Sequence, residues 1–370
     1  MHKFFHATKD TWISSGSNTA TTGISERDQN FGKDQILELK KIMFNESFDS
    51  NTRMLVQFDT DEIKTYISES NLSTGTYSAS LRLYEANGTQ GLPESFDISI
   101  HPISMSWDEG LGKIVDDPKT TQGCSYENRR KSLSGGVEVA WPDGWAGGIY
   151  ISSSAFTVTQ SFDHEAPDIN TDITKILQAQ MDGTIENHGY LIRLSGSREK
   201  SSGSFETLKY FSSDTHTIYN PKIEFKYDDH VIATGSATGS LNALDVSGAS
   251  DNILFKKGFR QSYKTDETVK FRLGARARYI DKTFSTSVQE TSGSYIPEGS
   301  GSYSIVDLAT GETVIPFSSF TTMSCDTTSP YFQQDMGGFY PQRVYKILVK
   351  VDQDDGQKII YDDNFEFTVV

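Results

Sequence analysis

Hydrophobic and polar residues alternate with a period of two in several segments of this chain. In residues 77–84 the side chains of Tyr77, Ala79, Leu81 and Leu83 fall on one face, and Ser78, Ser80 and Arg82 fall on the other. Residues 222–227 and 365–369 alternate in the same way. Because successive side chains of a strand point to opposite faces, this pattern predicts half-buried strands of antiparallel sheets.

Turn and helix signals interrupt these predicted strands. The dipeptides Asn87-Gly88, Asp182-Gly183 and Asp355-Gly356 are typical of hairpin turns. Asp59 and Glu62 have the spacing of a capping box, which predicts a short helix that begins after Asp59. A second short helix is predicted over residues 170–181, capped by Asn170 or Thr171 and ended by Gly183. We expect both helices to cover the ends of a β-sandwich.

Composition and charge exclude several classes of protein. The 370 residues are 35% hydrophobic and 12% aromatic, which is too aromatic for a disordered chain. The chain has 34 basic and 50 acidic residues, a net charge of −16, and this balance argues against broad nucleic-acid binding. No run approaches 18 apolar residues, so we expect no membrane span, and residues 1–6 do not resemble an export signal. Cys124 and Cys325 form no metal motif and are expected to stay reduced.

The chain is expected to form two β-sandwich domains. Residues 228–252 are rich in small polar residues, including Ala-Thr-Gly-Ser at 233–236 and again at 237–240, so they connect rather than pack. We therefore predict one domain over residues 1–230 and a second over 231–370, which begins with a linker or an edge strand. Five or more strand-like runs after residue 250 favour a small immunoglobulin-like sandwich.

The first 230 residues resemble the DNRLRE-type jelly-roll modules, relatives of carbohydrate-binding β-sandwiches. The segments that carry the resemblance occur in the family's order and are residues 8–13, 30–39, 53–59, 79–84, 107–110, 141–148, 172–174, 187–189, 211–213 and 221–227. Residues 112–141 depart from the family because they are long and polar. The resemblance implies an all-β protein: a jelly-roll followed by a smaller immunoglobulin-like sandwich.

The whole chain also resembles virion structural proteins of T4-like phages, notably cyanophages. That resemblance implies a non-enzymatic structural subunit of the neck, tail or baseplate, or a surface decoration, assembled in the host cytoplasm and located in the virion. It implies other virion subunits as partners in a large symmetric assembly, with no membrane or nucleic-acid partner. The alternative is a glycan-binding module for adhesion to a host surface.

Carboxylates offer a candidate calcium site and a candidate acid–base pair. Asp163, Glu165, Asp168 and Asp172 lie within ten residues and carry the oxygen ligands that Ca²⁺ prefers. A solvated acidic loop with helix caps is the simpler interpretation, and no other cofactor is expected. Asp108 and Glu109, together with Asp116 and Asp117, contain the carboxyl groups of a glycosidase. We interpret them as polar loop residues and expect no catalysis.

Three tryptophans, Trp107, Trp141 and Trp145, lie in glycine-rich segments. Exposed indole rings could stack on the apolar face of a sugar. The interpretation that we favour is that they cover the ends of the sandwich.

A row of basic residues is the most informative predicted surface. In residues 269–279 the side chains of Val269, Phe271, Leu273, Ala275, Ala277 and Tyr279 share one predicted face, and Lys270, Arg272, Arg276 and Arg278 share the other. Four like charges on one strand repel each other. Either an acidic partner surface neutralises them through Arg–carboxylate pairs, or acidic residues on neighbouring strands do so.

Overall fold

The computed structural model describes residues 1–370 except 17–24, 45–46, 89–90, 133–136, 143–145, 164–167, 280–283, 285 and 287–292. The chain divides into two compact units. The N-terminal unit comprises residues 5–225, and the C-terminal unit comprises residues 226–370 together with residues 1–4. Phe4 belongs to the core of the C-terminal unit, and Lys3 pairs with Asp335 at 2.7 Å. Within the described residues, no helix has the length and apolar composition needed to cross a membrane.

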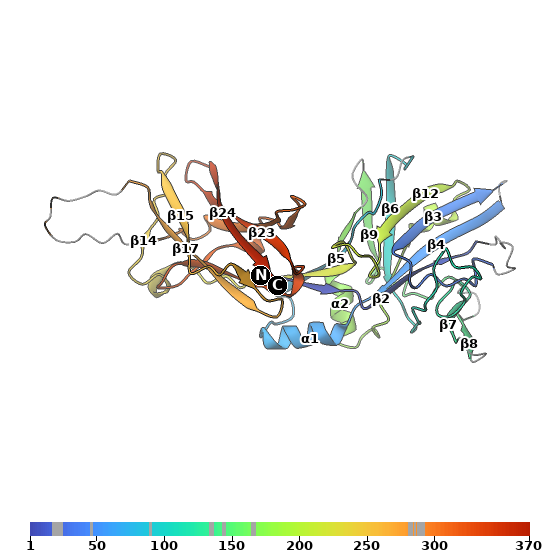
Figure 1. The fold of residues 1–370 in the computed structure, drawn as a ribbon. Coiled ribbons are helices and arrows are strands. Elements are labelled where there is room, and N and C mark those ends of the chain that lie inside the picture. Colours follow the sequence, from blue (N-terminus) through green and yellow to red (C-terminus); the bar gives the residue numbers. More distant parts are fainter. Residues whose placement is uncertain are drawn as a thin grey trace. The chain divides into compact units, whose positions relative to one another are not determined.

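Two sheets form the jelly-roll sandwich of the N-terminal unit, and two of their strands extend a few residues past its boundaries at residues 5 and 225 (Figure 1). One sheet has four strands, in the order β1 (His2–His6), β13 (Lys222–Tyr227), β5 (Tyr77–Leu83) and β10 (Ile169–Asp172). The other has seven, in the order β12 (Phe205–Phe211), β3 (Ile36–Phe44), β4 (Ser47–Gln57), β11 (Tyr190–Leu194), β6 (Ser95–Pro102) and β9 (Val158–Asp163), with β2 (Lys9–Ser14) paired to β4. Most neighbours are distant in sequence, as expected for crossover-connected strands.

A long segment of the N-terminal unit covers the seven-stranded sheet. Residues 103–157 leave β6 and return at β9, and they include the hairpin β7 (Asn128–Lys131) and β8 (Glu138–Ala140) (Figure 1). A small core joins this segment to the strands: Trp107, Cys124 and Trp141 cluster with Ile13, Leu55 and Leu191. The polar segment that departs from the jelly-roll resemblance therefore folds over one face of the sheet.

Three short α-helices occur in the described residues: α1 (Thr60–Glu69), α2 (Thr174–Met181) and α3 (Gly196–Lys200). The α1 start is as predicted, because the Asp59 carboxylate accepts the backbone N–H groups of Asp61 and Glu62. The predicted start of α2 is wrong by four residues. Asn170 and Thr171 pair in β10 with Arg82 and Leu81 of β5, so the strand takes the residues that were expected to cap the helix.

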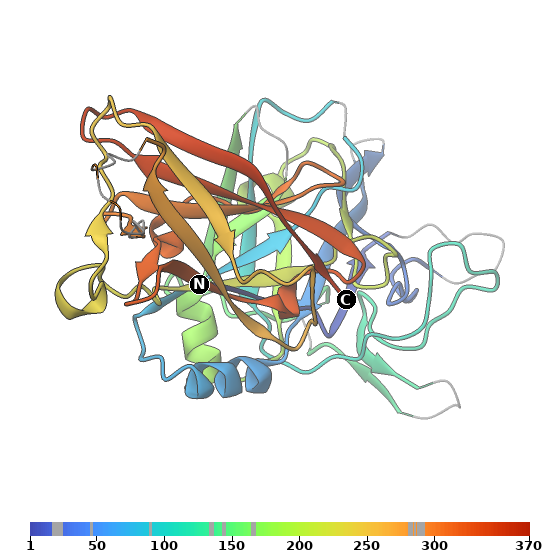
Figure 2. The same cartoon turned by 60° about the vertical axis from the view of Figure 1, so that its left-hand side comes forward.

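The C-terminal unit has the strand order of an immunoglobulin-like sandwich. One sheet contains β15 (Asn252–Lys257), β17 (Thr268–Ala277), β22 (Pro330–Asp335) and β21 (Ser324–Cys325), with β14 (Asn242–Ala243) and β18 (Ser294–Tyr295) at its end. The other contains β16 (Ser262–Tyr263), β24 (Lys358–Val369), β23 (Arg343–Asp352), β19 (Gly301–Asp307) and β20 (Thr313–Ile315). The first strand divides between the sheets: β15 pairs antiparallel with β17, and β16 pairs parallel with β24. Figure 2 shows the long red β23 and β24 beside the orange strands.

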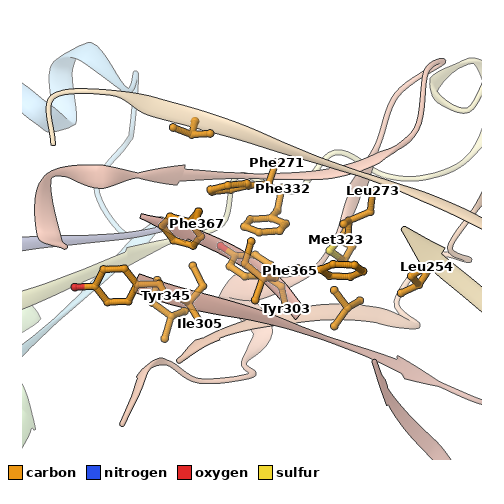
Figure 3. Packing of buried hydrophobic residues seen from close by; sticks show 14 of the residues in the cluster. Leu254, Phe271, Leu273, Tyr303, Ile305, Met323, Phe332, Tyr345, Phe365 and Phe367 are labelled. Carbon is orange, nitrogen blue, oxygen red and sulfur yellow. The ribbon is translucent and has the colours of Figure 1, made fainter. Parts of the chain in front are cut away.

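Aromatic rings fill the space between the two sheets (Figure 3). Tyr303 of β19 stacks on Phe332 of β22, with ring centroids 3.8 Å apart, so this pair joins one sheet to the other. Phe271 of β17 lies directly opposite Phe332 in the same sheet, and the two rings stack with their centroids 5.2 Å apart. Near the start of β23, the Tyr345 hydroxyl accepts the backbone N–H of Tyr340 at 3.0 Å. A tyrosine at this corner that bonds backwards to the preceding connection is a feature of immunoglobulin-like sandwiches.

Candidate functional site

The predicted alternation along β17 holds over most of the strand. Val269, Phe271, Leu273 and Ala275 are buried in the core, so the opposite face carries Lys270, Arg272 and Arg276 outwards. The prediction is wrong at the end of the strand. Ala277 and Tyr279 are exposed instead of buried, Tyr279 by 80%, because β17 ends at residue 277 and leaves the sandwich there.

Asp326 neutralises the first half of this basic row. The Arg272 guanidinium donates to both Asp326 oxygens, at 2.8 and 2.6 Å, and Lys270 Nζ lies 3.4 Å from the same carboxylate. Lys270 also lies over the Tyr331 ring, 3.6 Å from its centroid. The hydrogen bonds from Arg272 hold the pKa of Asp326 well below its ordinary value. Pairing within the unit therefore accounts for Lys270 and Arg272.

The second half of the row is more open. Arg278 pairs with Asp251 at 2.9 Å, with both side chains about half exposed. Arg276 donates only to backbone carbonyls, those of Ala277 and Arg278, and has no carboxylate partner in the described part of the chain. Three of the four basic residues thus pair with acidic residues of the same unit. The alternative of an acidic partner surface stays a prediction, and it concerns Arg276 above all.

Two further residues belong to this face and were missed by reading β17 alone. In the antiparallel register Lys257 of β15 lies opposite Arg272, and Phe255 lies opposite Gly274. A Cβ atom on Gly274 would approach the Phe255 ring to 2.1 Å, so the ring lies directly on the glycine. Phe255 is 42% exposed. The alternation of Ile253, Phe255 and Lys257 could have indicated this outward row, but not its neighbours. We call Phe255, Lys257, Lys270, Arg272, Arg276 and Arg278 the basic sheet face.

Of the three tryptophans, the two that the structure describes form no exposed sugar platform. Trp107 and Trp141 are 1% and 4% exposed, and their Nε1–H groups donate to the backbone carbonyls of His188 and Ser125. Lys9 Nζ lies 4.4 Å from the centroid of the Trp107 ring. The prediction of glycan stacking is wrong for these two residues because the sheet and the 103–157 segment enclose both rings. Trp145 lies outside the described residues.

The predicted calcium ligands do not converge in the described part of the chain. Asp168 accepts the backbone N–H of Glu85, and Asp172 accepts that of Thr174 at the start of α2. Asp163 is exposed at the end of β9, and Glu165 lies outside the described residues. Asp168 thus links the start of β10 to the residues after β5, and Asp172 binds the first residue of α2. Ile173 is the N-cap of α2 and its side chain makes no capping hydrogen bond, so the expected helix cap is wrong in this detail.

A different acidic cluster is formed by residues far apart in sequence. Carboxylate oxygens of Asp10, Glu109 and Asp214 lie within 4.8 Å of one another. Asp10 is 1% exposed, and its Oδ2 accepts the backbone N–H of Ser213 at 2.6 Å. Burial and the nearby Glu109 and Asp214 carboxylates raise the pKa of Asp10 to about 7.

A lysine supplies the positive charge at this cluster. Lys33 Nζ lies 2.7 Å from Glu109 and 3.2 Å from Asp214, so these two carboxylates already have a cation between them. The cluster has the oxygen donors that a divalent ion needs, but Lys33 already neutralises two of its three carboxylates. We interpret it as a structural ion pair that holds together β2 and the segments around residues 33, 109 and 214.

The other carboxylates considered for acid–base chemistry are engaged in the same local way. Asp108 pairs with Arg130 at 3.1 Å, and Asp116 accepts the backbone N–H of Lys113 at 2.8 Å. These contacts fit the interpretation as polar loop residues.

A buried ion-pair network lies on the seven-stranded sheet. Glu199 of α3 accepts from Arg53 at 2.9 Å and also from Arg193, and these guanidiniums lower its pKa although burial opposes the shift. Burial and Arg193 lower the pKa of the neighbouring His101 to about 4. His101 is therefore neutral at pH 7.

No protein-family model matches the sequence, and no curated protein is significantly similar to it.

Proposed function

We propose that this protein is a non-enzymatic structural subunit of a bacteriophage virion, in the neck, tail or baseplate or as a surface decoration, and that it acts through protein–protein contacts. The observation that carries the proposal is the basic sheet face. It offers the Arg276 guanidinium, which has no carboxylate partner among the described residues, the half-exposed Arg278–Asp251 pair and the exposed ring of Phe255.

The chemistry of this face favours an acidic protein surface as its partner. Arg binds carboxylates through two parallel hydrogen bonds, and buried aromatic and Arg residues contribute most at protein interfaces. The N-terminal unit has 19 basic and 31 acidic residues, whereas the C-terminal unit has 15 and 19. A cationic face on a chain of net charge −16 is therefore selective for a partner that can supply carboxylates.

The burial of Trp107 and Trp141 weakens the alternative of a glycan-binding module, since sugar stacking needs exposed rings. A glycan array would address it directly. We expect that the purified protein binds no glycan on the array. Binding of a glycan with a micromolar Kd would contradict the structural role.

The decisive experiment is incorporation into particles. Phage particles from the host of this sequence are purified by density gradient, disrupted, and analysed for the protein by mass spectrometry. Stoichiometric presence is expected, and absence would overturn the proposal. Complementation then compares Arg276→Glu/Arg278→Glu with the control Lys358→Glu, an exposed lysine of β24 outside the basic sheet face. We expect only the double variant to lose incorporation.

A further inference from the structure

A loop of the N-terminal unit exposes three aliphatic side chains. Leu111 is 56% exposed, Ile114 is 47% exposed and Val115 is 80% exposed. Single exposed aliphatic residues are ordinary, but three within five residues make a local apolar patch. We call residues 109–116 the aliphatic loop.

The aliphatic loop is fixed by one buried side chain. Asn30 is fully buried, and its Nδ2 donates to the carbonyls of Glu109 and Cys124, both at 2.7 Å. Its Oδ1 accepts the backbone N–H groups of Gly32 at 3.1 Å and Gly112 at 2.8 Å. All four hydrogen bonds that this amide offers to its surroundings are thus directed at the loop and its neighbours.

Close backbone packing adds to this rigidity. A Cβ on Gly32 would lie 2.0 Å from the Glu109 carbonyl oxygen, and one on Gly112 would lie 2.3 Å from the Asn30 carbonyl oxygen. Asp34 accepts the Ile114 backbone N–H through one oxygen and the Trp12 indole N–H through the other, both at 3.0 Å. The exposure of Ile114 and Val115 is therefore built into the fold.

The aliphatic loop forms one wall of a cleft of about 370 Å³. Ile114 and Val115 line it from the loop, Ile36 lines it from β3, and Lys113 and Lys209 are also among its lining residues. This volume is at the lower end of the range for ligand sites, about 300–1,000 Å³. It suits one or two side chains of a polypeptide.

Three lysines and two carboxylates line the cleft: Lys33, Lys113, Lys209, Asp34 and Glu38. Lys33 pairs with Glu109 and Asp214, and Glu38 pairs with Lys40 at 2.8 Å and lies opposite Lys209 in the strand register. Lys113 and Lys209 have no ion-pair partner in the part of the chain that the structure describes. The cleft thus combines aliphatic side chains with a small excess of positive charge, and two of its ammonium groups have no ion-pair partner among the described residues.

We propose that this cleft binds an extended acidic–aliphatic segment of a partner polypeptide. An aliphatic side chain of the segment packs against Ile114 and Val115, and flanking carboxylates pair with Lys113 and Lys209. Because side chains of an extended chain alternate, a sequence that alternates aliphatic and acidic residues matches the cleft. The site is on the N-terminal unit, so it is separate from the basic sheet face and does not depend on the virion proposal.

Calorimetric titration of the full chain tests this site with the peptide acetyl-Glu-Leu-Glu-Leu-Glu amide. Two control peptides replace either Glu by Lys or Leu by Ser. We expect a Kd near 100 μM, which is on the order expected for a contact of one or two side chains. The Kd should rise with salt concentration because charge pairs contribute to binding. Both control peptides should bind at least about tenfold more weakly. Absence of binding at about 2 mM peptide, or equal binding of the Lys peptide, would overturn the proposal.

Variants locate the site. Ile114→Ser/Val115→Ser and Lys113→Glu/Lys209→Glu should each weaken binding about tenfold. Val137→Ser, which changes another exposed aliphatic residue of the same unit, and Lys175→Glu, which changes an exposed lysine of α2, should leave it unchanged. Thermal unfolding confirms that each variant is folded. An equal Kd in all four variants would exclude this cleft.

Discussion

Arg272 of β17 donates hydrogen bonds to both carboxylate oxygens of Asp326, at 2.8 and 2.6 Å. The pKa of Asp326 is lower in the folded protein than in the unfolded chain, so this contribution to stability is present above about pH 4 and is lost as the pH falls. Asp326→Asn should lower the free energy of unfolding by about 1 kcal/mol at pH 7 and by less at pH 2.5. Urea unfolding at both pH values measures the difference, and a difference independent of pH would contradict it.

Two buried tyrosines of the C-terminal unit, Tyr345 and Tyr303, allow a matched test of the hydrogen bond between the Tyr345 hydroxyl and the Tyr340 backbone. Tyr345→Phe leaves the Tyr340 N–H without its acceptor and should cost about 1–2 kcal/mol. The Tyr303 hydroxyl is buried and has no hydrogen-bond partner among the described residues, so Tyr303→Phe should be neutral or stabilising. Chemical denaturation of both variants checks the ranking. Equal losses would show that the hydrogen bond at the corner contributes nothing.

The acidic cluster predicts a stabilising substitution at Asp10. Its pKa of about 7 in the folded protein lies above the ordinary value, so the folded state binds the proton more tightly. The resulting stabilisation is complete below about pH 4 and is lost as the pH rises through about 7. Asp10→Asn keeps an acceptor for the Ser213 N–H and removes the charge, so it should stabilise the protein by about 2 kcal/mol at pH 8.

The advantage of Asp10→Asn should shrink toward pH 5, where Asp10 is protonated. Thermal unfolding across this pH range tests the sign. Greater stability of the unsubstituted protein at pH 8 would mean that the ionised Asp10 is favourable there. That result would contradict the assigned pKa direction.

Replacement of the buried Asn30 by Asp, which has the same shape, should strongly destabilise the protein. Asn30→Asp places a carboxylate oxygen against the carbonyls of Glu109 and Cys124, where Nδ2 now donates. Loss of two buried hydrogen bonds and repulsion between oxygens should cost about 3 kcal/mol or more. Asn242→Asp, at an exposed position of β14, is the control and should cost less than about 0.5 kcal/mol. Denaturant unfolding compares the two.

The sequence was sufficient to predict an element wherever its hydrophobic and polar residues alternate regularly or a neighbouring residue caps it. Strands β5, β13 and β17 were predicted because hydrophobic and polar residues alternate along each of them, and the N-terminus of α1 was predicted because Asp59 caps it locally. The expected solvent-exposed face is wrong for β13, where Lys222 and Glu224 are 5% and 3% exposed. At α2 local reasoning failed, because pairing of Asn170 and Thr171 with β5 satisfies more backbone groups than a cap would.

The sequence by itself determined the all-β class, the inward aromatic residues and the outward basic row of β17, since these depend on side-chain alternation along single strands. Only the tertiary structure decided which charges are paired and which rings are exposed. Asp326 lies 54 residues from Arg272, Asp10 lies about a hundred from Glu109, and the enclosure of Trp107 depends on a whole folded segment. Such contacts are set by chain topology, which brings distant residues together and leaves no local periodic signal.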